Sequence, residues 1–195
     1  MSEIANNDLV DWTALLPSFA MHIEQASDRA KALSFDGPKL QISFEPAKLH
    51  DAEYREKLID RARIWRGGSG KSTIYVFNYS DPVPQGLINT LRNSANDSLA
   101  SVGRARAFPK CNARVKECCL YVGHSYKIES RLRDHLGFGT AGTSSLQLSH
   151  WDGHPHNKLN FTAYRLSTPD ELLAQLLEEY LWDELRPLLG KRSGK

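Results

Sequence analysis

The chain has 195 residues, of which 41% are hydrophobic and 25% charged, and its formal net charge is +2. This length suffices for one domain with a hydrophobic core, or for a small domain with an extension. The charge is too small to indicate a partner, and no apolar run reaches the roughly 18–20 residues of a membrane span. Three cysteines and no secretory signal favour reduced thiols. We therefore expect a cytoplasmic protein without a membrane segment.

The first 66 residues predict an N-terminal, mostly helical unit. Residues 9–34 carry apolar side chains at helical spacing, from Phe19 to Leu33, and Pro17 is expected to mark the start of the longer helix. Residues 40–44 alternate like a strand, and residues 52–65 form a second amphipathic pattern. Residues 66–70 have the composition of a linker. We expect one domain over 1–70, including this linker, and a second over 71–195.

The second domain predicts three strands and three helices. Strand patterns occupy residues 73–79, 118–123 and 158–166, and helical patterns occupy 82–93, 126–136 and a segment after Thr168. Thr168 is expected to cap the last helix, with Pro169 at its first position. Its expected buried face is Leu173, Leu176, Leu177, Tyr180 and Leu181. The predicted fold class is α/β (α+β), with a central antiparallel sheet of about three strands flanked by helices and preceded by the N-terminal helical extension.

Two tempting motifs are weak. Residues 67–72 look like a phosphate-binding loop, but Trp65 stands where that loop has its first glycine, and the segment follows a helix instead of opening one. A linker is the expected structure. His150, His154 and His156 are interrupted by glycine and proline, so we expect a solvent-facing turn and no metal cluster there.

A stronger pattern combines short motifs in a fixed order. Thr73-Ile74-Tyr75 precedes Tyr121-Val122-Gly123, Arg131 and His135 follow on a predicted helix, and Glu178 lies on the last helix. Each piece is common, whereas their order and spacing together are specific. From Thr73 to about Gly190 the chain resembles the GIY-YIG nuclease family. The resemblance implies Arg131 as the catalytic arginine, His135 as the histidine one turn later, and Glu178 as the ligand of Mg²⁺ (or Mn²⁺).

Elementary chemistry agrees with these roles. Tyr75 and Tyr121 are expected on adjacent strands, presenting two phenols to one pocket, although strand tyrosines are also ordinary packing residues. Arg131 offers a planar fork suited to phosphate oxygens, and His135, four positions on, shares its helix face. His124 follows Gly123, where some relatives have lysine, and is either a proton-transfer group or a loop histidine. Solvated surface residues are the alternative for Arg131, His135 and Glu178.

The sequence departs from the family in three places. Thr73 replaces the first glycine, Gly190 replaces an asparagine that helps complete the site in many members, and residues 81–116 form an insertion. The stretch from Ser98 to Lys116 contains basic residues and no acidic residue, so we expect it to bind nucleic acid. Its basic residues, the expected nucleic-acid-binding set, are Arg104, Arg106, Lys110, Arg114 and Lys116.

Three functions follow from these features. The first is a metal-dependent endonuclease that hydrolyses nucleic-acid phosphodiester bonds, with DNA as the expected substrate, through a single GIY-YIG-type site. The second is a GIY-YIG-like nucleic-acid-binding module with reduced catalysis, which Gly190 would favour. The third is a partner-binding protein that uses residues 1–66, either for a homodimer or for another protein.

Overall fold

Four antiparallel strands form a sheet in the order β1-β4-β2-β3, in a computed structural model that describes residues 12–66, 70–100, 107–113, 118–140, 142–151 and 158–192. The strands are β1 (Leu40–Phe44), β2 (Thr73–Tyr79), β3 (Cys119–Ser125) and β4 (Leu159–Arg165). The predicted α+β class with a helix-flanked antiparallel sheet is confirmed. The sheet has one strand more than predicted, because β1 pairs with β4 from Leu40 opposite Ala163 to Phe44 opposite Leu159.

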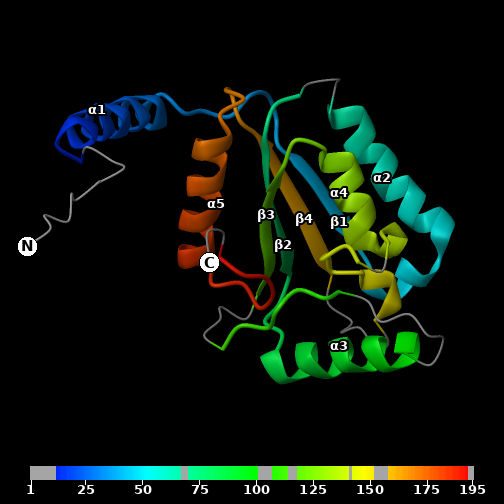
Figure 1. The fold of residues 1–195 in the computed structure, drawn as a ribbon. Coiled ribbons are helices and arrows are strands. Elements are labelled where there is room, and N and C mark those ends of the chain that lie inside the picture. Colours follow the sequence, from blue (N-terminus) through cyan, green and yellow to red (C-terminus); the bar gives the residue numbers. More distant parts are fainter. Residues whose placement is uncertain are drawn as a thin grey trace, which may run out of the picture. The chain divides into compact units, whose positions relative to one another are not determined.

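Helices cover both faces of this sheet. Figure 1 shows α2 (Ala52–Arg66) and α4 (Ile128–Arg133) on one face and α5 (Glu171–Leu185) on the other, with α3 (Gln85–Ala100) below one end of the strands. A π-helical turn, Asp134–Phe138, continues α4, and short 3-10 turns cover Pro46–His50 and Leu148–His150. Because β2 and β3 are covered on both sides, side chains on either face of these strands are buried or half-buried.

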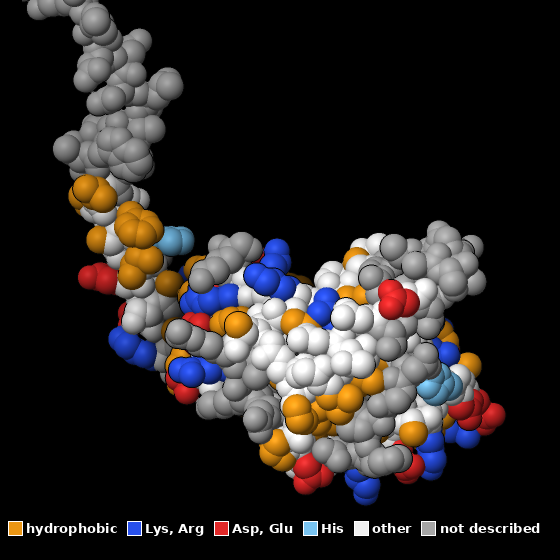
Figure 2. Space-filling model, turned by 90° about the horizontal axis from the view of Figure 1, so that it is seen from below, with side chains coloured by type: hydrophobic (Ala, Val, Ile, Leu, Met, Phe, Trp, Pro, Cys, Tyr) orange, Lys and Arg blue, Asp and Glu red, His pale blue; other side chains and the backbone are white. Residues whose placement is uncertain are grey.

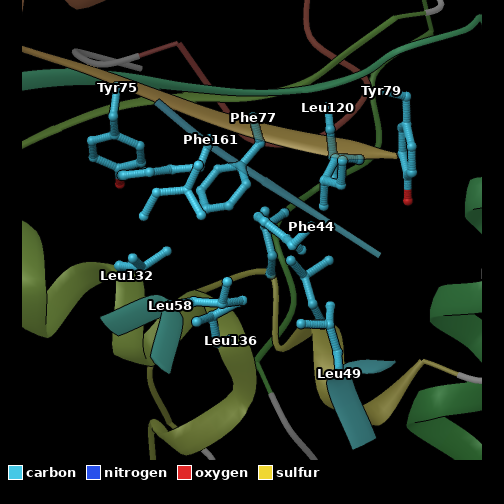
Figure 3. Packing of buried hydrophobic residues seen from close by; sticks show 14 of the residues in the cluster. Phe44, Leu49, Leu58, Tyr75, Phe77, Tyr79, Leu120, Leu132, Leu136 and Phe161 are labelled. Carbon is cyan, nitrogen blue, oxygen red and sulfur yellow. The ribbon is translucent and has the colours of Figure 1, made fainter. Parts of the chain in front are cut away.

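The main core lies between the sheet and the pair α2 and α4. Tyr75, Phe77 and Tyr79 alternate along β2 toward this side, as period-two geometry requires. Figure 3 shows them above Leu132 and other apolar side chains of the neighbouring elements, with the Tyr75 hydroxyl directed toward α4. The core therefore holds the first motif tyrosine in a fixed orientation.

The boundary between units differs from the predicted one at residue 70. The chain divides between Leu33 and Ser34, so the described residues 34–66 belong to the same unit as the sheet. The physical reason is the pairing of β1 with β4, together with the packing of α2 against α4. The predicted 81–116 insertion contains α3 and, among its described residues, a segment at 107–113.

The first unit contains helix α1 (Trp12–Lys31), which agrees with the predicted helix over the described residues. Pro17 lies inside the helix and does not start it. Leu16, Phe19 and Ile23 are 60%, 62% and 51% exposed, and hydrophobic side chains are visible on the surface of this helix in Figure 2. Across the described residues, no helix, α1 included, combines the length and apolarity that crossing a membrane requires.

Two other helices differ in detail from expectation. The backbone N–H of Leu173 donates to Asp170 Oδ1 at 3.1 Å, so Asp170 and not Thr168 caps α5. Leu173 is buried in α5, whereas Leu176 and Tyr180 are 48% and 61% exposed, so the expected buried face is only partly correct. α3 runs seven residues beyond the predicted end at 93, to Ala100.

Candidate active site

The register of β2 and β3 brings the two motif tyrosines together. Tyr75 lies opposite Gly123 and Phe77 lies opposite Tyr121, so the two tyrosines are diagonal neighbours on one face. Their rings are stacked, with centroids 6.2 Å apart and an interplanar angle of 20°. The prediction that they lie on adjacent strands is confirmed.

Arg131 connects both phenols. Its Nε donates to Tyr75 Oη at 3.2 Å, and its Nη2 donates to Tyr121 Oη at 3.4 Å and to the carbonyl oxygen of Ser144 at 3.0 Å. Ile128 and Leu132, each 1% exposed, anchor α4 in the core on either side of Arg131. Helix packing therefore aims the guanidinium at the tyrosine pair.

His135 lies behind Tyr75 and is fully buried. Its Nδ1 accepts a hydrogen bond from the backbone N–H of Leu146 at 3.1 Å, so this nitrogen carries no proton. The neutral ring therefore has its proton on Nε2, which donates to Tyr75 Oη at 3.0 Å. Burial, together with the charge of Arg131, lowers the pKa of His135 well below its usual value, which keeps the ring neutral.

The Tyr75 hydroxyl oxygen thus accepts two hydrogen bonds, one from Arg131 and one from His135. Tyr75 is 1% exposed, and burial raises the pKa of its phenol above the ordinary value. It is a neutral group at physiological pH. Tyr75 and His135 were expected to face the substrate pocket directly, and the structure places both beneath its wall, because β2 is central and α4 continues into a turn that packs His135 inward.

A cleft of about 330 Å³ opens on the outer side of this network. Arg131 and Tyr121 line it from α4 and β3, and Glu178 lines it from α5. Its remaining lining residues are Pro109, Lys110, Ser144, Gly190 and Lys191. The cleft therefore joins a phenol, a guanidinium, a carboxylate and two lysines that lie far apart in the sequence.

Glu178 forms an ion pair with His124. His124 Nδ1 lies 2.5 Å from Glu178 Oε2, and the side chains are 23% and 12% exposed. The hydrogen bond to Glu178 raises the pKa of His124 above its usual value, against the opposing effect of burial. The bond to Glu178 therefore favours the protonated form of His124 relative to an ordinary histidine. The pair also fixes the position of the carboxylate beside the cleft.

The donor set at the cleft fits a hydrated divalent cation. Mg²⁺ prefers oxygen ligands, keeps several waters and needs only one or two carboxylates plus substrate phosphate. Glu178 supplies such a carboxylate in the cleft. Within the described ranges no cluster of three or more His, Cys, Asp or Glu side chains could enclose a metal, so Glu178 with solvent and substrate oxygens is the set that fits.

Backbone pairing places two lysines at the cleft. The N–H of Gly190 donates to the carbonyl of Lys110 at 2.8 Å, and Cys111 forms an isolated antiparallel bridge with Leu189. Lys110 was an expected nucleic-acid contact, and the structure brings it to the site. The expected contacts Arg104, Arg106, Arg114 and Lys116 lie outside the described residues. Lys191 was missed as a site residue, although it belongs to the basic pair Lys191-Arg192 near the C-terminal end of the sequence, which is a signal for binding an anion.

Gly190 has a structural role of its own. Its φ is +105°, and a Cβ atom there would lie 3.2 Å from Cε2 of Tyr121. A side chain at this position would be strained and would press on the tyrosine ring. Glycine at position 190 is thus matched to its local geometry.

The residues of the cleft and its wall suit chemistry on a phosphate ester. The Arg131 guanidinium, which is hydrogen-bonded to Tyr121, attracts phosphate oxygens together with the two lysines. The Tyr121 phenol can orient a water molecule, and the Glu178 carboxylate can bind a cation. No family model, curated protein or solved structure was found to match the chain. The arrangement of its own residues therefore carries the functional argument.

Proposed function

We propose that this protein is a metal-dependent endonuclease that hydrolyses nucleic-acid phosphodiester bonds, with DNA as the expected substrate, through one GIY-YIG-type site. One observation carries the proposal. The Arg131 guanidinium is joined to both motif tyrosines at the wall of a cleft that Glu178 also lines. The same residues carry the resemblance of the sequence to the GIY-YIG family.

The reaction requires charge stabilisation. Water adds to phosphorus, the bond from phosphorus to the leaving oxygen breaks, and negative charge builds on the phosphate oxygens and the leaving oxygen. A positioned cation is most effective where that charge develops. Arg131 is held from behind by Tyr75, so its guanidinium is oriented before substrate arrives. Lys110 and Lys191 add positive charge at the same cleft.

Tyr121 is the phenol that lines the cleft, so we assign it contact with the attacking water or the phosphate. Tyr75 and His135 act as positioning residues, because the buried Tyr75 hydroxyl accepts a hydrogen bond from Arg131 and His135 in turn bonds to Tyr75. His124 bonds to Glu178, which raises the pKa of its imidazole, and we assign it the return of a proton to the leaving oxygen. Glu178 would hold Mg²⁺, which when bound supplies Lewis-acid stabilisation of the phosphate and leaving oxygens.

Nicking of supercoiled plasmid tests the proposal. Wild type should nick plasmid with Mg²⁺ and not with EDTA, and Glu178→Gln, which keeps the shape of the side chain but removes its charge, should lose nicking. Glu179→Gln is the matched control on the neighbouring residue of α5 and should keep it. Absence of nicking by wild type across divalent metals and DNA forms would contradict the proposal.

The second candidate is a nucleic-acid-binding module with reduced catalysis. The contact of Glu178 with His124 favours it, because a carboxylate oxygen engaged by an imidazole is less available to a metal. This candidate predicts a gel shift of DNA that weakens steeply with salt, without nicking. The EDTA and gel-shift measurements together therefore separate a nuclease from a binding module.

A further inference from the structure

A second cleft, of about 410 Å³, lies at the C-terminal end of α5. It is lined by Asn112, Ala113, Trp182, Asp183 and Arg186. The volume lies within the range of small-molecule pockets, about 300–1,000 Å³. The roles assigned at the first cleft use none of these residues, so this cleft needs its own explanation.

Trp182 gives the cleft an aromatic wall. The indole is half-buried, and its Nε1 is buried without a hydrogen-bond partner among the described residues. The part of Trp182 that lines the cleft is therefore offered as ring surface and not as a hydrogen-bond donor. An aromatic surface of this kind suits stacking of a flat heterocycle.

Arg186 adds positive charge to the same cleft. Its backbone adopts φ +42°, and its N–H closes the helix end by donating to the Trp182 carbonyl at 2.9 Å. The Arg186 side chain is exposed and has no ion pair within the described part of the chain. Asp183 does not neutralise it, because the Asp183 carboxylate accepts from Arg192 Nε at 3.1 Å on both oxygens.

One pair of backbone segments contributes to both clefts. Gly190 N–H donates to the Lys110 carbonyl at 2.8 Å, and Asn112 N–H donates to the Leu188 carbonyl at 3.0 Å. Lys110 and Gly190 line the first cleft, and Asn112 lines the second. Two residues along an extended segment span roughly 6.6 Å, so the clefts are close enough for neighbouring parts of one polymer.

From this arrangement we propose that the second cleft is a subsite for an unpaired nucleobase next to the phosphate held at the first cleft. This rests on the proposed function and names its substrate class, a nucleic acid with at least one unpaired nucleotide at the cutting position. The base stacks on Trp182, and Arg186 meets the adjoining phosphate. Bases inside a duplex are out of reach of such a pocket unless they are extruded, so single strands, flaps and bulges bind better than a regular duplex.

Binding without turnover tests the subsite. The probe is a labelled oligothymidylate of about 12 nucleotides, compared by fluorescence anisotropy in EDTA with an abasic oligomer of equal length. The variants are Trp182→Leu, which removes the stacking surface, and Trp182→Phe, which retains an aromatic ring. Tyr180→Leu is the matched control, because Tyr180 is an exposed aromatic residue on the same helix that does not line the cleft.

Wild type should bind the oligothymidylate about 5- to 150-fold more tightly than the abasic oligomer, the factor expected for one stacked base. Trp182→Leu should lose this ratio while its affinity for the abasic oligomer stays unchanged, and Trp182→Phe and Tyr180→Leu should keep most of it. Equal affinities of the wild type for the two oligomers would contradict the proposed subsite. This comparison uses the wild type alone, so it does not depend on whether a variant folds. A ratio retained by Trp182→Leu overturns it as well.

The subsite and the nuclease fail separately. If wild type nicks plasmid but does not distinguish the two oligomers, the nuclease stands and the subsite falls. If the wild type prefers the base-containing oligomer but does not nick DNA, the subsite is supported and the protein is a nucleic-acid-binding module.

Discussion

Gly123 lies directly opposite Tyr75 in the β2–β3 ladder, and a Cβ atom at Gly123 would stand 2.5 Å from the Tyr75 hydroxyl oxygen. The same atom would stand 2.9 Å from Cε1 of Tyr121. The glycine of the Tyr-Val-Gly motif thus leaves the space in which the two phenols and Arg131 meet. This contact explains the glycine by packing, without any need for unusual backbone torsion.

Gly123→Ala should therefore damage the site and the fold together. The added methyl group must displace the rigid Tyr75 ring, and overpacking of this kind costs about 1–3 kcal/mol. Chemical denaturation should show that loss, and nicking should fall because Arg131 loses its oriented partner. Gly86→Ala, where nothing lies within 4 Å of the added atom, is the control. Unchanged stability of Gly123→Ala would refute the packing explanation.

His135→Leu should destabilise the protein by about 2–5 kcal/mol at pH near 7.5, because it leaves the Leu146 N–H and the Tyr75 hydroxyl with one partner fewer in the core. The loss should be smaller at pH near 5.5. The folded-state pKa of His135 lies well below its unfolded value of about 6.5. Its contribution is thus complete above that value and declines as pH falls, by at most about 1.4 kcal/mol per pH unit.

Urea denaturation of wild type and His135→Leu at the two pH values measures this difference. Subtracting one protein from the other cancels the other titrating groups. A stability gap that widens as the pH falls would mean that His135 is protonated in the folded protein, in conflict with its bond from the Leu146 amide.

His124 should titrate above its usual value in wild type and below the wild-type value in Glu178→Gln, because the hydrogen bond to Glu178 is the main cause of the raised pKa. The His124 ring proton followed by NMR across pH gives both values. With a raised folded-state pKa, the pair stabilises the fold fully below about pH 6.5, and that contribution is lost as the pH rises through the folded-state pKa. Identical titration in both proteins would place His124 away from Glu178.

Gly190→Asn should not raise the nicking rate, although asparagine is the residue that the family resemblance predicts at this position. With φ +105° and Tyr121 Cε2 at 3.2 Å from the added Cβ, the substitution should cost about 1–3 kcal/mol and reduce nicking. Gly142→Asn, at a position with open space around the added atom, controls for a general effect of asparagine. A gain in nicking by Gly190→Asn would show that the asparagine side chain outweighs the strain.

Local patterns in the sequence predicted the strands well. Alternation identified β2 at its observed bounds and placed β4 within one residue, and the adjacency of Tyr75 and Tyr121 followed from the motif order. The unit boundary did not follow, because the pairing of β1 with β4 joins residues about 120 positions apart in the chain and leaves no local signal. Residues 40–44 therefore looked like part of the N-terminal unit.

Within the site, the residues that take part were easier to predict than how deeply each of them is buried. Arg131, Tyr121 and Glu178 meet at one cleft as expected, whereas Tyr75 and His135 lie beneath it. The helical repeat correctly placed His135 on the Arg131 face, since both side chains bond the Tyr75 hydroxyl, but it carried no signal that His135 would be fully buried. Lys191 and Trp182 were missed because the pairing of 110–112 with 188–190, which builds both clefts, is irregular backbone without a periodic pattern.

The most direct test is the single-turnover nicking rate of Arg131→Lys beside that of Arg133→Lys. Both variants keep the positive charge in the same helix, but only Arg131 holds the two tyrosine hydroxyls, whereas Arg133 pairs with Glu56 at 2.8 Å. We predict a fall of about 10²–10³-fold for Arg131→Lys, the loss typical of one positioned charge-stabilising group, and little change for Arg133→Lys. Equal rates for the two variants would contradict the assignment of Arg131 as the group that stabilises the transition state.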